Sequence, residues 1–199
     1  MSTVTISDTP FVGNDRLLVG IVLSVLTFWL FAQSVINVVP AMKSSLDISL
    51  ETLTLAVSLS ALFSGCFVVA SGGLADKFGR MRMTTLGLGL SIVGSAMLVV
   101  AQGPGLFLAG RVLQGLSAAC IMPATLALIK TWYEGRARQR AVSFWVIGSW
   151  GGSGLCSFVG GAIATGLGWR WIFVFSIAVA LLALFLLRGT PESRSASAS

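Results

Sequence analysis

The chain has 199 residues, of which 55% are hydrophobic and only 10% are charged, and its mean hydropathy is +0.92. Soluble domains carry about 25% charged residues, so this composition excludes an ordinary soluble protein and is typical of a membrane protein. The net charge of +6 does not indicate nucleic-acid binding, because the basic residues form short clusters between long apolar segments.

Six segments with no charged residue, or with one, are long enough to cross a membrane. About 20 helical residues cross a hydrocarbon core of about 30 Å. The sequence therefore predicts an all-α integral membrane protein, with residues 1–15 as a disordered cytoplasmic tail, 16–188 as a six-helix bundle and 189–199 as a polar cytoplasmic tail. The expected spans are about 17–39, 53–74, 84–101, 105–129, 143–165 and 170–187.

Lysine and arginine are distributed unequally between the two sides of this arrangement. All but three of the 13 lie in segments that share one side. The exceptions are Lys43 and Arg170, on the other side, and Arg111, which lies within a span. Because short cytoplasmic loops are enriched in Lys and Arg, the asymmetry predicts that both ends of the chain lie in the cytoplasm.

The connection between the second and third expected helices has an acid at the head of a basic run. Asp76 is followed by Lys77, Arg80 and Arg82. One interpretation is a basic connector that only fixes topology. The other gives the Asp76 carboxylate a role, because it can cap the following helix and pair with Arg80 or Arg82.

This connection resembles the signature G-x-x-x-D-[RK]-x-G-R-[RK]-[RK] that transporters of the major facilitator superfamily carry between helices two and three. Met81 departs from the signature where a second basic residue is usual. The resemblance implies a cytoplasmic latch between the two halves of a transporter, which locks one access state. The matching positions are Gly72, Asp76, Lys77, Gly79, Arg80 and Arg82.

Arg111 is a charge inside the fourth expected span. A cation in a membrane helix costs at least about 2.5–3.5 kcal/mol on insertion scales, so it normally faces protein, water or a partner. Snorkelling to the outer headgroups is the alternative, because Arg111 lies only about 9 Å from the start of its helix. Gln114, one turn further, favours a wet protein face. Arg111, Gln114 and Gly115, followed by Ala118 and Ala119, resemble the family signature R-x-x-Q-G-x-x-A-A, which implies that Arg111 couples proton movement to transport.

Small residues recur every four positions along the fifth expected helix and leave one face almost bare. Such a face serves close helix packing, because lipid offers large apolar side chains as much contact as protein does. The segment also resembles the pattern G-x-x-x-G-P-x-x-G-G of drug exporters in the same family, but Cys156 and Ser157 replace its Gly-Pro pair and remove the proline kink. The stripe consists of Gly148, Gly152, Cys156, Gly160 and Ala164, with Gly161 completing the pattern.

The chain from about Gly13 to Glu192 resembles the fourteen-helix drug:proton antiporter branch of this family. The resemblance implies that the six helices form the N-terminal half of a barrel in a bacterial plasma membrane. It implies export of quinolones and other amphiphilic drugs in exchange for protons. The expected partners are therefore drugs, protons, the lipid bilayer, and a missing C-terminal half or a second copy.

The acidic residues offer no clear proton carrier. All seven lie outside the apolar spans, and Glu51, at the outer start of the second span, is the nearest to one. Proton coupling usually relies on a membrane carboxylate whose pKa is raised by burial until it titrates near neutrality. We therefore expect the carrier in sequence outside this chain, unless Glu51 reaches inward.

Candidate substrate contacts are polar and aromatic residues of the first and fifth expected helices. Gln33 and Asn37 are four residues apart, so they share one helix face and favour a wet cavity. Trp29 and Trp145 can attract amphiphilic cations through the ring quadrupole, although tryptophan is also an ordinary packing and interface residue.

Two alternatives use the same helices. One is a small six-helix membrane protein that is complete in itself and serves as a pore or an assembly partner, and the other is an inactive fragment without autonomous transport. An intramembrane enzyme is not supported, because the chain has no His, no paired membrane acids and no nucleotide-binding G-x-x-x-x-G-K-[ST] loop. We expect no metal and no cofactor, since Cys66, Cys120 and Cys156 are far apart in the sequence.

Overall fold

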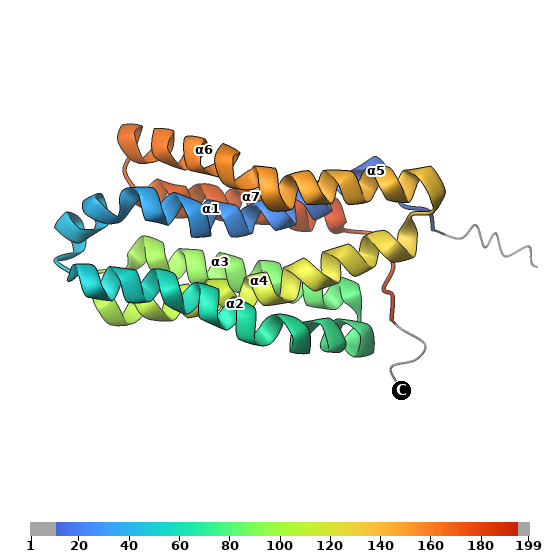
Figure 1. Cartoon of the computed structure of the whole chain (residues 1–199), viewed down its shortest axis with the longest axis horizontal. Helices are drawn as coiled ribbons and strands as arrows, with labels where there is room; N and C mark the ends of the chain where they lie inside the picture. Colours follow the sequence, from blue (N-terminus) through green and yellow to red (C-terminus); the bar gives the residue numbers. More distant parts are fainter. Residues whose placement is uncertain (1–10, 195–199) are drawn as a thin grey trace, which may run out of the picture.

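The computed structural model describes residues 11–194, apart from the side chains of residues 33–37, and this part of the chain is a bundle of long helices (Figure 1). Six helical stretches in it are long and apolar enough to cross a membrane, which confirms the predicted fold class. The elements are α1 Asp15–Leu46, α2 Leu50–Phe78, α3 Arg80–Val100, α4 Pro104–Trp132, α5 Gly135–Val146, the π-helical turn η1 Ile147–Gly151, α6 Gly152–Gly166 and α7 Arg170–Leu187.

Local sequence signals set where the first helices begin. Asn14 caps α1, because its side chain accepts a hydrogen bond from the N–H of Leu17, and Ser49 caps α2 in the same way through Thr52. Pro104 opens α4, where its missing N–H costs nothing. The helices therefore extend beyond the apolar segments that hydropathy alone marks.

The fifth span is one helix made of α5, η1 and α6, and it runs from Gly135 to Gly166. The helix starts well before residue 143, where the sequence analysis places the start of the span. Its first turns contain Arg136, Arg138 and Arg140, and these charges excluded them from the expected apolar span. Arginine favours a helix almost as strongly as alanine does, so hydropathy locates entry into the membrane and not the start of the helix. The turn η1 ends just before Gly152, where the exporter pattern begins, and so lies N-terminal to Ser157, which stands in place of the proline of that pattern. Turns of π-helix are common at functional sites.

The spans form an open arc in the order α2, α4, α3, α7, α1 and the fifth span, with α1 and α4 also in contact at the centre. Within the described residues, α2 and the fifth span do not contact each other. The pattern of neighbouring helices is the same in the two halves of this arc. If α1 is exchanged with α4, α2 with the fifth span and α3 with α7, the main helix contacts stay the same, as expected for two three-helix repeats. Figure 1 shows the two resulting layers, with α1, α7 and the fifth span in one and α2, α3 and α4 in the other.

Close contact between helices rests on small residues. A Cβ atom at Gly94 of α3 would lie 2.9 Å from the carbonyl oxygen of Gly110 in α4, and a Cβ at Gly110 would lie equally close to the oxygen of Gly94. Packing of this kind holds membrane helices together without a hydrophobic driving force. Large buried rings of Phe31, Phe107 and Phe173 fill the remaining interior.

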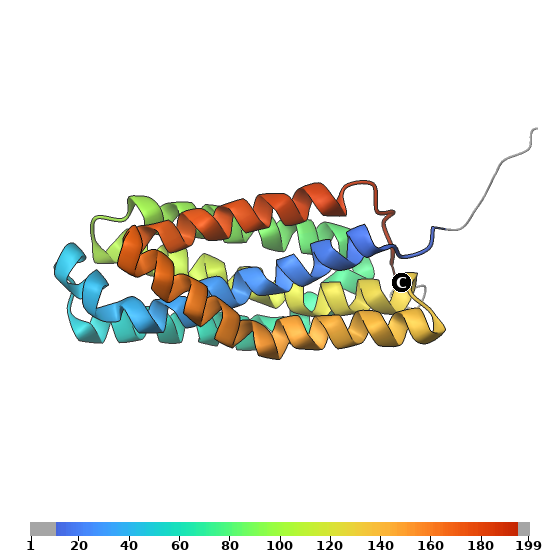
Figure 2. The same cartoon turned by 90° about the horizontal axis from the view of Figure 1, so that it is seen from above.

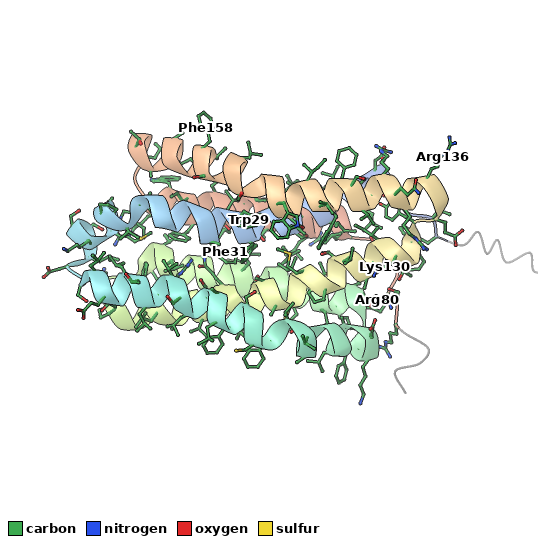
Figure 3. All side chains as sticks on the ribbon, viewed as in Figure 1. Trp29, Phe31, Arg80, Lys130, Arg136 and Phe158 are labelled. Carbon is green, nitrogen blue, oxygen red and sulfur yellow. The ribbon has the colours of Figure 1, made fainter. Side chains whose placement is uncertain are left out.

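Most of the basic residues gather at one end of the bundle, called here the basic end. The two ends of the described chain, residues 11 and 194, also lie there (Figure 2). Figure 3 shows Arg80, Lys130 and Arg136 at this end. The grouping of charge that the sequence predicts is therefore present in three dimensions.

The segment before α1 is tied to the end of α4 at the basic end. The N–H of Gly13 donates to the carbonyl oxygen of Trp132 at 2.7 Å, and the hydroxyl of Tyr133 donates to the carbonyl oxygen of Asn14 at 2.6 Å. Burial, with a smaller effect of the nearby Asp15 charge, raises the pKa of Tyr133 to about 12. Tyr133 therefore remains a protonated donor at physiological pH.

Candidate functional site: a buried arginine and a latch at the basic end

Arg111 of α4 is fully buried, and its guanidinium bonds to three helices. Its Nε donates to the carbonyl oxygen of Ala56 at 3.2 Å and one Nη to that of Phe31 at 2.9 Å. The same Nη donates to Gln114 Oε1 at 2.9 Å, and the other donates to Ser60 Oγ at 2.8 Å. Arg111 thus faces protein and does not snorkel to the headgroups.

Gln114 and Gly115 complete this group, called here the arginine centre (Arg111, Gln114, Gly115, Ser60 and Ser95). The amide nitrogen of Gln114 donates to Ser95 Oγ of α3 at 3.1 Å, so four helices join. A Cβ atom at Gly115 would lie 3.0 Å from the Cα of Ser60 and closer still to its carbonyl oxygen. Only glycine at this position lets α2 approach near enough for Ser60 to reach the guanidinium. Sequence analysis missed Ser60 and Ser95, because serine is common in these helices.

The charge of the arginine centre has no carboxylate partner among the residues that the structure describes. The ion pairs found in residues 11–194 lie at the basic end and join Arg80 to Asp76, Arg82 to Glu192 and Arg140 to Asp15. Within that part of the chain, the groups that accept hydrogen bonds from the Arg111 cation are carbonyl and hydroxyl oxygens. Such a site can respond to an anionic group that enters from outside it.

Asp76 of α2 and Arg80 of α3 pair within the connection that the sequence analysis predicts to be a latch. The Nε and one Nη of Arg80 both donate to the same Asp76 oxygen, at 3.0 and 2.8 Å. The other Nη of Arg80 donates to the hydroxyl of Thr131 near the end of α4. Arg80, and not Arg82, is therefore the partner of Asp76, and the pair links three helices at the basic end.

Glu192, which sequence analysis left outside the site, caps α3 in place of Asp76. Its two carboxylate oxygens accept from the N–H groups of Met81 at 2.9 Å and Arg82 at 3.0 Å. The adjacent Ser193 carbonyl accepts from the N–H of Arg80 at 3.0 Å. An acid at a helix N-terminus satisfies free N–H groups and complements the helix dipole. The expectation that Asp76 caps α3 is wrong, and the separation of Glu192 in sequence hides its role.

The other residues of the connection have supporting positions. Gly79 has a φ of 123°, which side chains rarely adopt, and a Cβ there would collide with the carboxyl group of Glu192. A Cβ at Gly72 would be 3.6 Å from Pro123, which is ordinary contact. The amine of Lys77 lies 6.0 Å from the ring centre of Phe78. Only Gly79 therefore requires glycine for its conformation.

Replacing Glu192 by Gln is expected to loosen the first turn of α3. The amide keeps the shape but removes the charge that two N–H groups and Arg82 contact, so we expect a loss of about 1 kcal/mol in local stability. Hydrogen exchange at the amides of Met81 and Arg82 should accelerate about fivefold. The matched control is Glu134→Gln, because Glu134 lies at the same end and makes no capping bond. Equal exchange in both variants would exclude this role of Glu192.

Three members of the small-residue stripe pack against α1. Cβ atoms at Gly148 and Gly152 would lie 3.3 Å from Val22 and 2.7 Å from Leu26, and Cys156 Sγ is 3.8 Å from the Leu26 carbonyl oxygen. Gly160 is buried as well. Gly161 differs, because a Cβ there would meet nothing within 4 Å. The members of the stripe that contact α1 are Gly148, Gly152 and Cys156.

Trp29 and Trp145, the two expected substrate contacts whose side chains the structure describes, contact different helices. Trp29 packs on the fifth span, and its Nε1 is buried with no partner among the described residues. Trp145 Nε1 donates to Thr125 Oγ1 of α4 at 3.1 Å, which makes it a contact between helices. The side chains of Gln33 and Asn37 lie outside the described residues. Figure 3 shows Trp29 and Phe31 between the two layers.

Comparison with known proteins places these features in a family. A family model described as Major Facilitator Superfamily matches residues 17–199. The chain belongs to the major facilitator superfamily. Among solved structures, major facilitator proteins such as a D-xylose–proton symporter superpose with a TM-score of 0.76 at 20% identity, over 90% of this chain and 48% of that one. A peptide transporter POT in complex with sulfate superposes with a TM-score of 0.76 at 18% identity, and the match covers 88% of this chain and 37% of that one. These likenesses show the fold alone.

Curated relatives from this superfamily are closer in sequence. The quinolone resistance protein NorB of Staphylococcus aureus strain JH9 is 60% identical over 193 residues, and the same protein of strain Newman gives the same values. The match covers 97% of this chain and 42% of the relative. The chain therefore spans less than half the length of the NorB proteins that it matches, and it aligns with their N-terminal part.

Proposed function

We propose that this chain is the N-terminal half of a multidrug efflux transporter of the quinolone-resistance type. It works by drug:proton antiport with alternating access, and both of its ends face the cytoplasm of a bacterial cell. The observation that carries the proposal is 60% identity to a quinolone resistance protein over 97% of the chain. The basic end, with most of the lysines and arginines, supports the orientation.

The open arc supports a function that needs a second half. Between α2 and the fifth span, no described helix covers the central pair α1 and α4. In transporters with internal repeats, substrate sites lie between the repeated halves, which rock around them. A C-terminal half that closes the gap would place Trp29 beside the shared cavity.

The arginine centre supports proton coupling through a carboxylate that enters from elsewhere. Glu51 is exposed in the first turn of α2, at the end opposite the basic end, so it does not reach inward. A carboxylate that approaches Arg111 would be favoured in its charged form and released on protonation. Protonation would thereby loosen the contact between halves and link proton binding to conformation.

The proposal is tested by restoring the missing part. Three cultures of a drug-sensitive bacterial strain are compared. The first expresses this chain alone, the second expresses it together with the C-terminal part of S. aureus NorB as a separate chain, and the third expresses only that C-terminal part. We expect quinolone resistance and ethidium efflux only when both chains are present. Lack of efflux from the pair, with both chains in the membrane, would contradict the proposal. Efflux by the chain alone would instead favour a self-assembling six-helix protein.

Asp76→Asn is expected to abolish efflux by the pair without lowering its abundance in the membrane. The amide removes the charge that holds Arg80 and, through it, Thr131, so the latch loses its charge-assisted bonds. Efflux should fall at least about tenfold, while immunoblots of the membrane fraction stay constant. Asp47→Asn is the control, since Asp47 lies between α1 and α2 at the opposite end. Full efflux by the Asp76→Asn variant would refute the latch role.

A further inference from the structure

A furrow runs along the outer side of α1, where α7 and the fifth span separate. The two helices meet near the connection between them, because α7 contacts α6. Toward the basic end they diverge, and α5 does not contact α7 within the described residues. Figure 2 shows α1, in blue, lying between the red α7 and the orange-yellow fifth span. The furrow faces away from α4 and so lies outside the proposed transport cavity.

Two hollows make up this furrow and join at Leu23 of α1. The first, of about 300 Å³, has apolar walls that include Leu18, Val22 and Phe144, with Asp15 and Arg140 among its lining residues. The second, of about 150 Å³, continues between α1, α6 and α7, and its lining is apolar throughout. From Asp15 to Leu30 the furrow follows α1 for about 22 Å. That exceeds the depth of one membrane leaflet, about 15 Å, so an acyl chain fits along it.

The mouth of the furrow carries net positive charge. Arg140 pairs with Asp15 at 3.1 Å, but the two side chains are 60% and 74% exposed, so the pair is weak. Arg136 lies one turn away on the same face of α5 as Arg140. Arg16 stands on the α7 side of the mouth, where it donates to the Phe185 carbonyl oxygen. One arginine that pairs with the carboxylate, and two further arginines on the neighbouring helical turns, therefore give this end of the furrow a positive charge.

We propose that this furrow binds an anionic phospholipid. One acyl chain lies along α1 against Leu23, and the phosphate takes the place of Asp15 as the partner of Arg140, with which it forms charge-assisted hydrogen bonds. A cationic amphiphile fits the apolar walls equally well, but the arginines at the mouth repel it. This site goes beyond the proposed function, since it requires only that the bundle sits in a bilayer.

The proposal is tested by native mass spectrometry of the purified chain, titrated with phosphatidylglycerol and with phosphatidylcholine of the same acyl chains. We expect one phosphatidylglycerol bound at least about tenfold more tightly than phosphatidylcholine. Arg140→Gln should remove that preference. The control Lys130→Gln removes the same charge from an exposed position at the same end, on α4, and should keep it. Equal preference in Arg140→Gln and Lys130→Gln, or none in the wild type, would overturn the proposal.

A second variant tests the acyl-chain part of the site separately. Leu23→Trp fills the point where the two hollows join, so it should lower the affinity for both lipids about fivefold without changing which lipid is preferred. Unchanged affinity for both lipids would show that the chain lies elsewhere. Because the readout is bound lipid, its failure leaves the efflux experiment unaffected.

Discussion

Arg111→Leu is expected to abolish efflux by the complemented pair while leaving the bundle nearly as stable as the wild type. The substitution removes four hydrogen bonds, each worth about 0.6 kcal/mol between membrane helices. It also removes a buried cation that costs at least about 2.5–3.5 kcal/mol. These two effects nearly cancel, so the free energy of unfolding should change by about 1 kcal/mol or less. Efflux should fall by at least about 100-fold.

Arg111→Lys is the informative comparison. An ammonium keeps the charge but is a compact group that lacks the planar fork, so it cannot bond to Phe31, Ala56 and Ser60 together. We expect this variant to lose efflux and also stability, because a buried charge is left poorly bonded. Thermal unfolding in detergent and ethidium efflux measure the two effects. Substantial efflux by Arg111→Leu would show that the arginine only packs the bundle.

Gly115→Val is expected to cause the largest loss of stability. The new side chain would enter the space of the Ser60 backbone and of the Phe63 Cβ, which a Gly115 Cβ would approach to 3.0 Å. Backbone atoms cannot swing away, so α2 must move off α4, and we expect a cost of about 3 kcal/mol. The amount of folded protein in the membrane should fall accordingly.

A second glycine of α4 provides the matched control. A Cβ at Gly105 would meet nothing within 4 Å, so Gly105→Ala should change stability by no more than about 0.5 kcal/mol. Melting curves of both variants in the same detergent compare them directly. If the Gly115→Val variant has the same melting temperature as the Gly105→Ala variant, α2 and α4 are less closely packed than the structure indicates.

The number of membrane spans follows from the sequence because charges are excluded from the hydrocarbon region. The same physics identifies Arg111, since an uncompensated charge in an apolar segment must find partners. Its actual partners could not be predicted, because Phe31 and Ala56 contribute only carbonyl groups, which every residue has. Gly115 carries a signal in its motif, but the motif does not say which helix comes close.

The basic end shows the other limit of sequence reasoning. Asp76 and Arg80 are four residues apart and pair within one connection, so local spacing suffices to suggest the contact. Glu192 reaches the same connection only because α7 ends beside α3, and no pattern in the chain encodes that meeting. Likewise, η1 is invisible in the sequence, since its residues are as compatible with an α-helix as with a π-helical turn.

The turn η1 has a consequence for how this protein can diverge. A π-helical turn holds one residue more than the α-helical turn that it replaces. Loss of a single residue from the middle of a membrane helix ordinarily rotates everything downstream by about 100°. Loss of one residue between Ile147 and Gly151 would instead regularise the helix, and Cys156 would keep facing α1. Descendants of this gene can therefore shorten here without rebuilding the rest of the span.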